Sequence, residues 1–286
     1  MHSTAFLSLA AAGAASPVHT QGSEIWTSWF DDPLVEMLLG FFLAVYLVGL
    51  VSMMSRQHQK WPVGKPRVLA FFGAILALVV ALLSPIDALA ERLFSVHMLQ
   101  HLFLIFGAAP LLAYSNTHLV LLRALPLSGR RSLGRAIAAI PGIRQAAQKE
   151  VAAWIAAAVF VASMWFWHIP AAYDWALANP VVHVCEHVTL LASATFFWRV
   201  ILTSGDRRLS PATAVILVSL VGIQGSFLAA LIMFAPRSLY AAYAANGMDD
   251  QALSGVLMCI PASFIYLGST IWALSRMIGN GRSHAR

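Results

Sequence analysis

FSVHMLQHLFL, residues 94–104, is apolar enough to lie in a membrane, yet it carries two histidines four residues apart. Helical residues with this spacing differ by about 40° around the axis and about 6 Å along it, so His97 and His101 share one face. Polar groups within a bilayer are costly, so they normally face the protein interior and have partners there. The stretch therefore predicts a membrane-spanning helix whose inward face bears two imidazoles.

The whole chain has the composition of an integral membrane protein. Of its 286 residues, 59% are hydrophobic and only 10% are charged, and the mean hydropathy is +0.75, whereas a soluble domain has about 25% charged residues. Strands of a membrane β-barrel would be short and strictly alternating, so we expect an all-α bundle of transmembrane helices. Seven windows have the roughly 20 apolar residues that a crossing helix needs: 34–54, 68–86, 93–114, 151–169, 181–202, 212–235 and 253–274.

The basic residues predict how these spans are oriented. If the N-terminus lies outside, all of the 18 Lys and Arg residues except Arg92 and Arg237 fall in inner loops or in the C-terminal tail. This is a strong positive-inside pattern. It predicts an outer N-terminus and a cytoplasmic C-terminus, which requires an odd number of spans. Because topology accounts for the net charge of +6, we expect no nucleic-acid partner.

Three regions are expected along the chain. Residues 1–33 form an outer tail, whose first 20 residues resemble a signal peptide without the usual basic start. Residues 34–275 form the seven-helix domain, and residues 276–286 form a cytoplasmic tail. Within the domain, the basic connection 115–150 is expected to contain short helices that lie on the membrane surface and contact anionic lipids.

A second histidine pair occurs in HVCEH, residues 183–187, with Glu186 beside it. His168 lies at the outer end of the fourth expected span, so the topology places five of the ten histidines in the outer third of the membrane. Neutral imidazole is the commonest biological metal ligand, and a pair four residues apart offers two ligands from one rigid element. We therefore predict a metal site made by His97, His101, His168, His183 and His187.

Other donors flank this layer. Asp250, at the mouth of the seventh span, and Met258, about two turns deeper, are expected as further ligands. Other side chains are expected to support the ligands from around the site: Gln100, Glu186, Gln251 and Met164. Imidazole suits zinc, copper and iron, whereas thioether favours Cu(I). We expect copper, as Cu(I), with zinc as the alternative.

The two histidine pairs occur in similar surroundings. SPIDALAERLFSVHMLQH precedes and enters the third span, and IPAAYDWALANPVVHVCEH precedes and enters the fifth. Both run Pro, Asp, Ala-Leu-Ala and then His-x-x-x-His. This weak internal repeat predicts a two-helix unit that is used twice in parallel.

Several motifs occur together and in a fixed order: HMLQH, WHIPAAYDWAL, HVCEH followed by FFW, IQGSFLAALIMF and DDQALSGVLM. Over roughly residues 30–275, they resemble the CtaG family of seven-helix membrane proteins, assembly factors for caa-type cytochrome c oxidase. The family's histidines fall on the five named above, and its aspartate-glutamine pair falls on Asp250 and Gln251.

The resemblance implies a function without turnover. The protein would assist formation of the CuB copper centre in the catalytic subunit of a haem–copper oxidase. It would act in the bacterial cytoplasmic membrane, with an outer-side copper chaperone as a further partner.

Rival functions follow from the same residues. HVCEH fits H-x-x-E-H, in which two histidines bind zinc and the glutamate is the general base, so an intramembrane zinc hydrolase is the alternative. A carrier of two haems would need histidines on both sides of the membrane. A copper transporter would need polar or soft groups through the inner half, where Gln224 is the main candidate.

Overall fold

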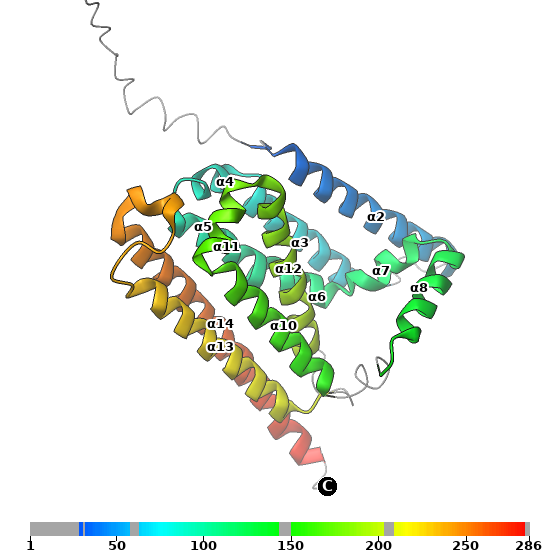
Figure 1. Ribbon diagram of the computed structural model, residues 1–286. Helices are drawn as coiled ribbons and strands as arrows, with labels where there is room; N and C mark the ends of the chain where they lie inside the picture. The colour runs from blue at the N-terminus through cyan, green and yellow to red at the C-terminus, as the bar shows by residue number, and fades with distance from the viewer. Residues whose placement is uncertain (1–28, 31, 58–62, 143–149, 203–208, 284–286) are drawn as a thin grey trace, which may run out of the picture.

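The structure, a computed structural model, describes residues 29, 30, 32–57, 63–142, 150–202 and 209–283, with side chains as far as residue 278. Within these ranges the elements are helical and no strand occurs, which confirms the all-α class (Figure 1). Two short elements are not α-helical: η1 (Phe103–Ala108) is a π-helix and η2 (Ala241–Asn246) is a 3₁₀-helix. The α-helices are α2 (Pro33–Gln57), α3 (Lys65–Leu82), α4 (Pro85–Ala90), α5 (Phe94–Leu102), α6 (Ala109–Ser115), α7 (Thr117–Ala124), α8 (Leu127–Ala139), α10 (Val151–Trp167), α11 (Pro170–Ala178), α12 (Pro180–Leu202), α13 (Pro211–Met233) and α14 (Gly247–Ser283).

In the part of the chain that the structure describes, six helical segments are long and apolar enough to cross a membrane, and a seventh is present if the bent pair α10–α11 is one span. Their outward faces carry large apolar side chains, such as Phe41 (70% exposed), Leu69 (70%) and Phe264 (71%). A soluble monomer rarely leaves so much contiguous apolar surface in water. The chain is therefore a multi-pass membrane protein.

The fourth span ends in a sharp bend. The window expected at 151–169 corresponds to α10, which has 17 residues, and α11 then leaves at an angle of 74°. Ile169 is extended and Pro170 begins α11, because a residue before proline is disfavoured in the helical conformation. His168 follows the last residue of α10 at this break, and its side chain is buried.

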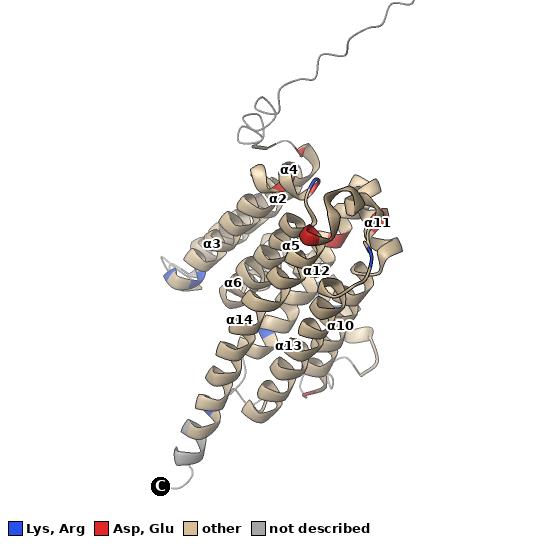
Figure 2. Ribbon diagram, turned by 90° about the vertical axis from the view of Figure 1, so that its left-hand side faces the viewer, with Lys and Arg blue, Asp and Glu red and all other residues tan. Residues whose placement is uncertain are grey.

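The helices pack as neighbouring pairs. α13 lies along α14, α10 along α12, and α5 against α14, while α3 packs on α6 and η1 (Figure 1). Asp and Glu gather mainly at the end of the bundle that holds α4 and α11, as Figure 2 shows. The acidic residues of the described chain thus lie mainly at one end of the fold. Placement of this acidic end outside the membrane stays a prediction.

The third span changes its winding halfway. α5, η1 and α6 form one continuous helical segment, Phe94–Ser115. The indole Nε1 of Trp198, from α12, donates a hydrogen bond of 2.8 Å to the backbone oxygen of Ile105 within η1. A π turn frees backbone groups from the regular pattern and often occurs at functional sites. The hydrogen bond from Trp198 links the third span to α12 one turn after His101.

The predicted two-helix unit occurs twice. The short helix α4 precedes α5, which carries the first histidine pair, and the short helix α11 precedes α12, which carries the second. Each short helix has proline in its first turn. The sequence repeat therefore corresponds to a structural one.

The boundaries differ from expectation at the ends and in the basic connection. The short helices expected within 115–150 are α7 and α8, while residues 143–149 and most of the expected tail 1–33 lie outside the described residues. α14 runs from Gly247 to Ser283, beyond both ends of the window 253–274. Proline within a helix usually breaks it, but this helix continues through Pro261.

Glu150 predicts a dependence of stability on pH. Its carboxylate accepts hydrogen bonds from the backbone N–H of Ser210 (3.0 Å) and the hydroxyl of Thr213 (2.9 Å) at the start of α13. These bonds, the one from Ser210 first, hold the pKa of Glu150 below its ordinary value of 4.5. Because the folded pKa is lower than the unfolded one, the stabilisation is present above about pH 4.5 and is lost as pH falls through the folded pKa.

We expect Glu150→Gln to lower the melting temperature at neutral pH and the difference from wild type to shrink below about pH 4.5. Thermal denaturation in detergent across this range measures it. An equal difference at neutral and acidic pH would contradict this account of Glu150.

Candidate metal centre

The first histidine helix is positioned by an acid from the far end of the chain. The carboxylate of Asp250, in α14, accepts hydrogen bonds from the backbone N–H of Phe94 (2.8 Å) and Ser95 (3.2 Å), and from the Ser95 hydroxyl (2.5 Å). The first N–H groups of a helix have no partner within the helix, so a carboxylate there acts as a cap. Asp250 thus fixes where α5 begins and hence where its histidines lie.

We expect Asp250→Ala to lower the free energy of unfolding by about 1 kcal/mol, the usual loss for a helix cap, and to change metal affinity far less than removal of a histidine does. Thermal denaturation and metal titration of the purified protein measure both. Asp249→Ala, at the exposed neighbouring position, is the matched control. A large fall in metal affinity with unchanged stability would instead make Asp250 a ligand.

His97 is fully buried, and its hydrogen bonds define which nitrogen carries the proton. The Tyr243 hydroxyl lies 2.6 Å from the backbone oxygen of Ala90 and must donate its single hydrogen to it. The contact of 3.2 Å between that hydroxyl and Nδ1 of His97 therefore requires His97 to donate. Nε2 of His97 is left with a lone pair. A second partner that fixes the tautomer in this way is typical of histidines that bind metals.

His101, the other histidine of α5, faces His97 with its own Nε2 atom. Nε2 of His101 lies 3.1 Å from Nε2 of His97, and 3.5 Å from Oε1 of the buried Glu186. Two nitrogens bound to one tetrahedral ion at about 2.0–2.1 Å would be about 3.3 Å apart. The pair therefore already has nearly the separation that a shared ion needs.

The second pair, from α12, completes a group of imidazoles. The ring centroids of His183 and His187 lie 4.3 Å apart, and those of His97 and His183 lie 5.3 Å apart. One ligand atom from each of His97, His183 and His187 can be chosen so that all three lie within 4.8 Å of one another. A second such group consists of His97, His101 and Glu186. Either group could hold one metal ion.

His168 joins from the bend after α10. Its Nδ1 lies 2.7 Å from the backbone oxygen of Met164 and must donate to it, because a carbonyl only accepts. Nε2 then carries a lone pair, and it is buried without a hydrogen-bond partner among the described residues. The ring centroid of His168 lies 6.3 Å from that of His101. All five predicted histidines thus form one continuous cluster.

The cluster leaves several polar atoms unsatisfied. In the described part of the chain, no hydrogen bond reaches Nδ1 of His101, Nε2 of His183 or Nε2 of His187, nor either carboxylate oxygen of Glu186 as judged by hydrogen-bond geometry. Buried polar atoms nearly always have partners, and leaving one unpaired costs about 1–3 kcal/mol. Neutral imidazoles and a carboxylate are ordinary ligands of zinc and copper. The donor set therefore fits a metal ion.

Three predicted site residues lie elsewhere in the structure. Asp250 caps α5, as described. The side-chain oxygen of Gln251 accepts a hydrogen bond of 2.8 Å from the backbone N–H of Leu239, in the segment that connects α13 and α14. The amide of Gln100 donates to the backbone oxygen of Ala81 (2.9 Å) and to the carboxylate of Asp87 (2.7 Å). Gln100 was expected to orient an imidazole, but these bonds hold α5 against the end of α3 and α4.

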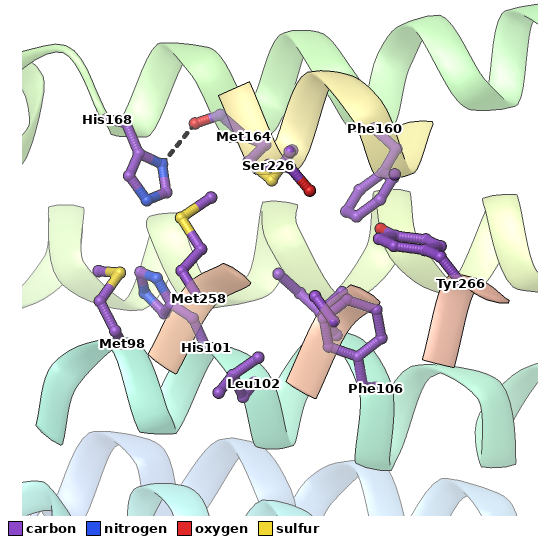
Figure 3. Close-up of a pocket in the computed structure, with 14 residues that line it drawn as sticks. Met98, His101, Leu102, Phe106, Phe160, Met164, His168, Ser226, Met258 and Tyr266 are labelled. Carbon is purple, nitrogen blue, oxygen red and sulfur yellow. Dashed lines mark hydrogen bonds between the residues drawn. The ribbon is translucent and has the colours of Figure 1, made fainter. Parts of the chain in front are cut away.

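The predicted methionines lie beside the cluster. Met164 and Met258 line a small cavity together with Met98, His101 and His168. Figure 3 shows these five side chains at one end of it and aromatic rings at the other. The cavity has a volume of about 30 Å³, roughly the space for one or two water molecules.

A larger cavity reaches the cluster from the acidic end. It has a volume of about 700 Å³ and is lined by Asp32, Asp87, Glu91 and His183, among others. His183 is also the partly exposed member of the imidazole group. A cation can therefore approach the buried histidines through an acidic vestibule.

Sequence reasoning missed Tyr243, which sets the tautomer of His97. The tyrosine lies in η2 between two spans, in the stretch AAYAAN, and nothing in that stretch marks it as a neighbour of His97. Only the fold brings the two together. Met98, the residue after His97, lies on the wall of the small cavity.

The fold and the cluster define a class: a multi-pass helical membrane protein with a buried group of histidines that can bind a metal. The model of the family described as cytochrome c oxidase caa3 assembly factor (Caa3_CtaG) matches residues 44–280. The chain belongs to this family. The resemblance noted from the motifs is therefore confirmed.

Two mycobacterial proteins are similar to part of the chain. They are "Uncharacterized protein Mb0105" of Mycobacterium bovis and "Uncharacterized protein MT0111" of Mycobacterium tuberculosis, each 31% identical over 107 residues, or 37% of this chain. The chain spans 16% of the length of each of these relatives. No solved structure matches the chain.

Proposed function

We propose that the protein binds copper, as Cu(I), in its histidine cluster and assists formation of the CuB centre of a haem–copper oxidase. The observation that carries the proposal is the set of unpaired imidazole nitrogens on three different helical segments. A structural histidine core would satisfy these nitrogens with neighbours. A site for cargo leaves them available.

The arrangement suits delivery rather than permanent storage. The candidate donors outnumber the four positions of a closed tetrahedral site, so ligands can exchange while copper remains bound. CuB also lies within the membrane, so a donor at similar depth can pass copper sideways to the catalytic subunit. No turnover is required, and the role is that of a metal chaperone.

The positive-inside pattern supports a site near the outer face of the bacterial cytoplasmic membrane. The acidic vestibule would then open to the outside, where an outer copper chaperone can reach it. The partners proposed are this chaperone and the oxidase catalytic subunit, with anionic lipids contacting the basic helix α8.

A deletion strain tests the proposal. We expect its oxidase to retain haem but to lose copper at CuB, and plasmid-borne wild-type protein to restore both copper and oxygen consumption. Copper and haem analysis of the purified oxidase measures this. An oxidase with its full copper content in the deletion strain would refute the assembly role.

A zinc hydrolase is the second candidate, favoured by the buried carboxylate of Glu186 beside His101. In that case Glu186 would be the general base. Glu186→Gln would then abolish turnover while zinc stayed bound. The copper proposal instead expects the substitution to change copper affinity by about 10–100-fold, as for other groups that support ligands.

A further inference from the structure

The small cavity beside the cluster has an unusual set of side chains at one end. Three methionines reach it from three different spans: Met98 from α5, Met164 from α10 and Met258 from α14. Met98 and Met164 are buried, with 2% and 5% of their surface exposed. Figure 3 shows the sulfurs of Met98 and Met258 at the same end as the rings of His101 and His168, and the side chain of Met164 next to Ser226.

Methionine is a common packing residue, so three methionines alone do not make a site. The second observation is His168. Its Nδ1 is committed to the backbone oxygen of Met164, and its buried Nε2 has no partner in the described ranges. Because His168 lines the cavity, a nitrogen with a lone pair and three thioethers line the same apolar space.

We propose that this cavity is a second copper site, specific for Cu(I), held by Met98, Met164, Met258 and His168. It deepens the proposed function, on which it rests, by dividing the copper-binding region into two compartments. One is the imidazole group of His97, His183 and His187. The other is this thioether cavity, and His101 stands between them.

The donor chemistry separates the metals that the two compartments accept. Thioethers are soft ligands that select Cu(I), whereas zinc prefers nitrogen, oxygen and thiolate. A cavity of about 30 Å³ lined mainly by carbon and sulfur offers no room for a hydrated divalent ion. The imidazole group can bind either metal, so only the thioether cavity discriminates between them.

His101 is placed to connect the compartments. Its Nε2 lies 3.1 Å from Nε2 of His97, while the residue also lines the thioether cavity. Its ring thus contacts both sites. An ion can pass from one to the other by exchanging ligands one at a time, without leaving the protein.

The test is anaerobic titration of the purified full-length protein with Cu(I) against a chromophoric Cu(I) chelator, together with copper X-ray absorption. We expect wild type to bind two Cu(I) ions and to show sulfur scattering, and to bind one Zn²⁺. The double variant Met164→Leu, Met258→Leu should bind one Cu(I) ion, lose most of the sulfur signal and keep its zinc. Leucine conserves volume, so the fold should tolerate the change.

Met53→Leu, at a partly buried methionine packed on the α2–α3 side of the protein, is the control and should behave as wild type. Two ions or undiminished sulfur scattering in the double variant would overturn the inference. A wild-type protein that binds copper through nitrogen alone would also overturn it but leave the proposed function standing. If His97→Ala left all copper binding intact, the imidazole site would fail instead, while the thioether result would still stand.

Discussion

Replacing His97 with alanine is expected to lower the Cu(I) affinity of the imidazole group by more than about 100-fold. Removing groups that merely support ligands already costs about 10–100-fold, and His97 belongs to both of the groups that can hold an ion. The loss should exceed that for His183→Ala, because His183 belongs to only one of them. Competition titration of the purified variants measures the order.

His118→Ala is the control for this prediction. His118 lies in α7 and is exposed, and it belongs to neither candidate ligand group. We expect its copper binding to equal that of wild type. Equal effects of His97→Ala and His118→Ala would mean that the cluster does not bind the metal.

The second large effect is expected at Gly255, where α14 meets α13. A Cβ atom at Gly255 would lie 2.7 Å from Cβ of Met233 and 2.8 Å from the backbone oxygen of Ala229. These are closer than van der Waals contact, so one helix must move. Overpacking of this kind costs about 1–3 kcal/mol. We expect Gly255→Ala to lower the melting temperature and, because α14 also carries Asp250 and Met258, to weaken copper binding.

Gly268→Ala provides the matched control in the same helix. Nothing lies within 4 Å of a Cβ atom built there, and alanine favours a helix by about 1 kcal/mol over glycine. Its melting temperature should equal or exceed that of wild type. A Gly255→Ala protein as stable as Gly268→Ala would show that the two helices are not packed this closely.

The helical class and the histidine layer could be predicted because they follow from local patterns. Apolar windows mark the spans, and the four-residue spacing puts both members of each histidine pair on one helix face. The bend after α10 was only partly predictable. Pro170 marks a break, but the angle of α11 depends on how Tyr173 packs against Phe94 and Tyr240.

The supporting residues could not be predicted in the same way, since their partners are distant in sequence. Asp250 and Gln251 lie side by side in one helix turn, but one caps α5 and the other holds the α13–α14 connection. Gln100 occupies the position that Glu186 has in the other pair, but it bonds Asp87 in α4. Residues at equivalent positions of the repeat thus have different hydrogen-bond partners. The position of a residue in the motif does not predict its partner.

The π turn in the third span has a mechanical consequence. The indole of Trp198, in α12, donates a hydrogen bond to the backbone oxygen of Ile105, in the third span. This bond directly joins the two spans that bear the histidine pairs. The two pairs should therefore shift as one rigid frame. Lateral release of an ion, by a path other than the acidic vestibule, would then require movement of the bend at His168 or of α14, which this hydrogen bond does not hold.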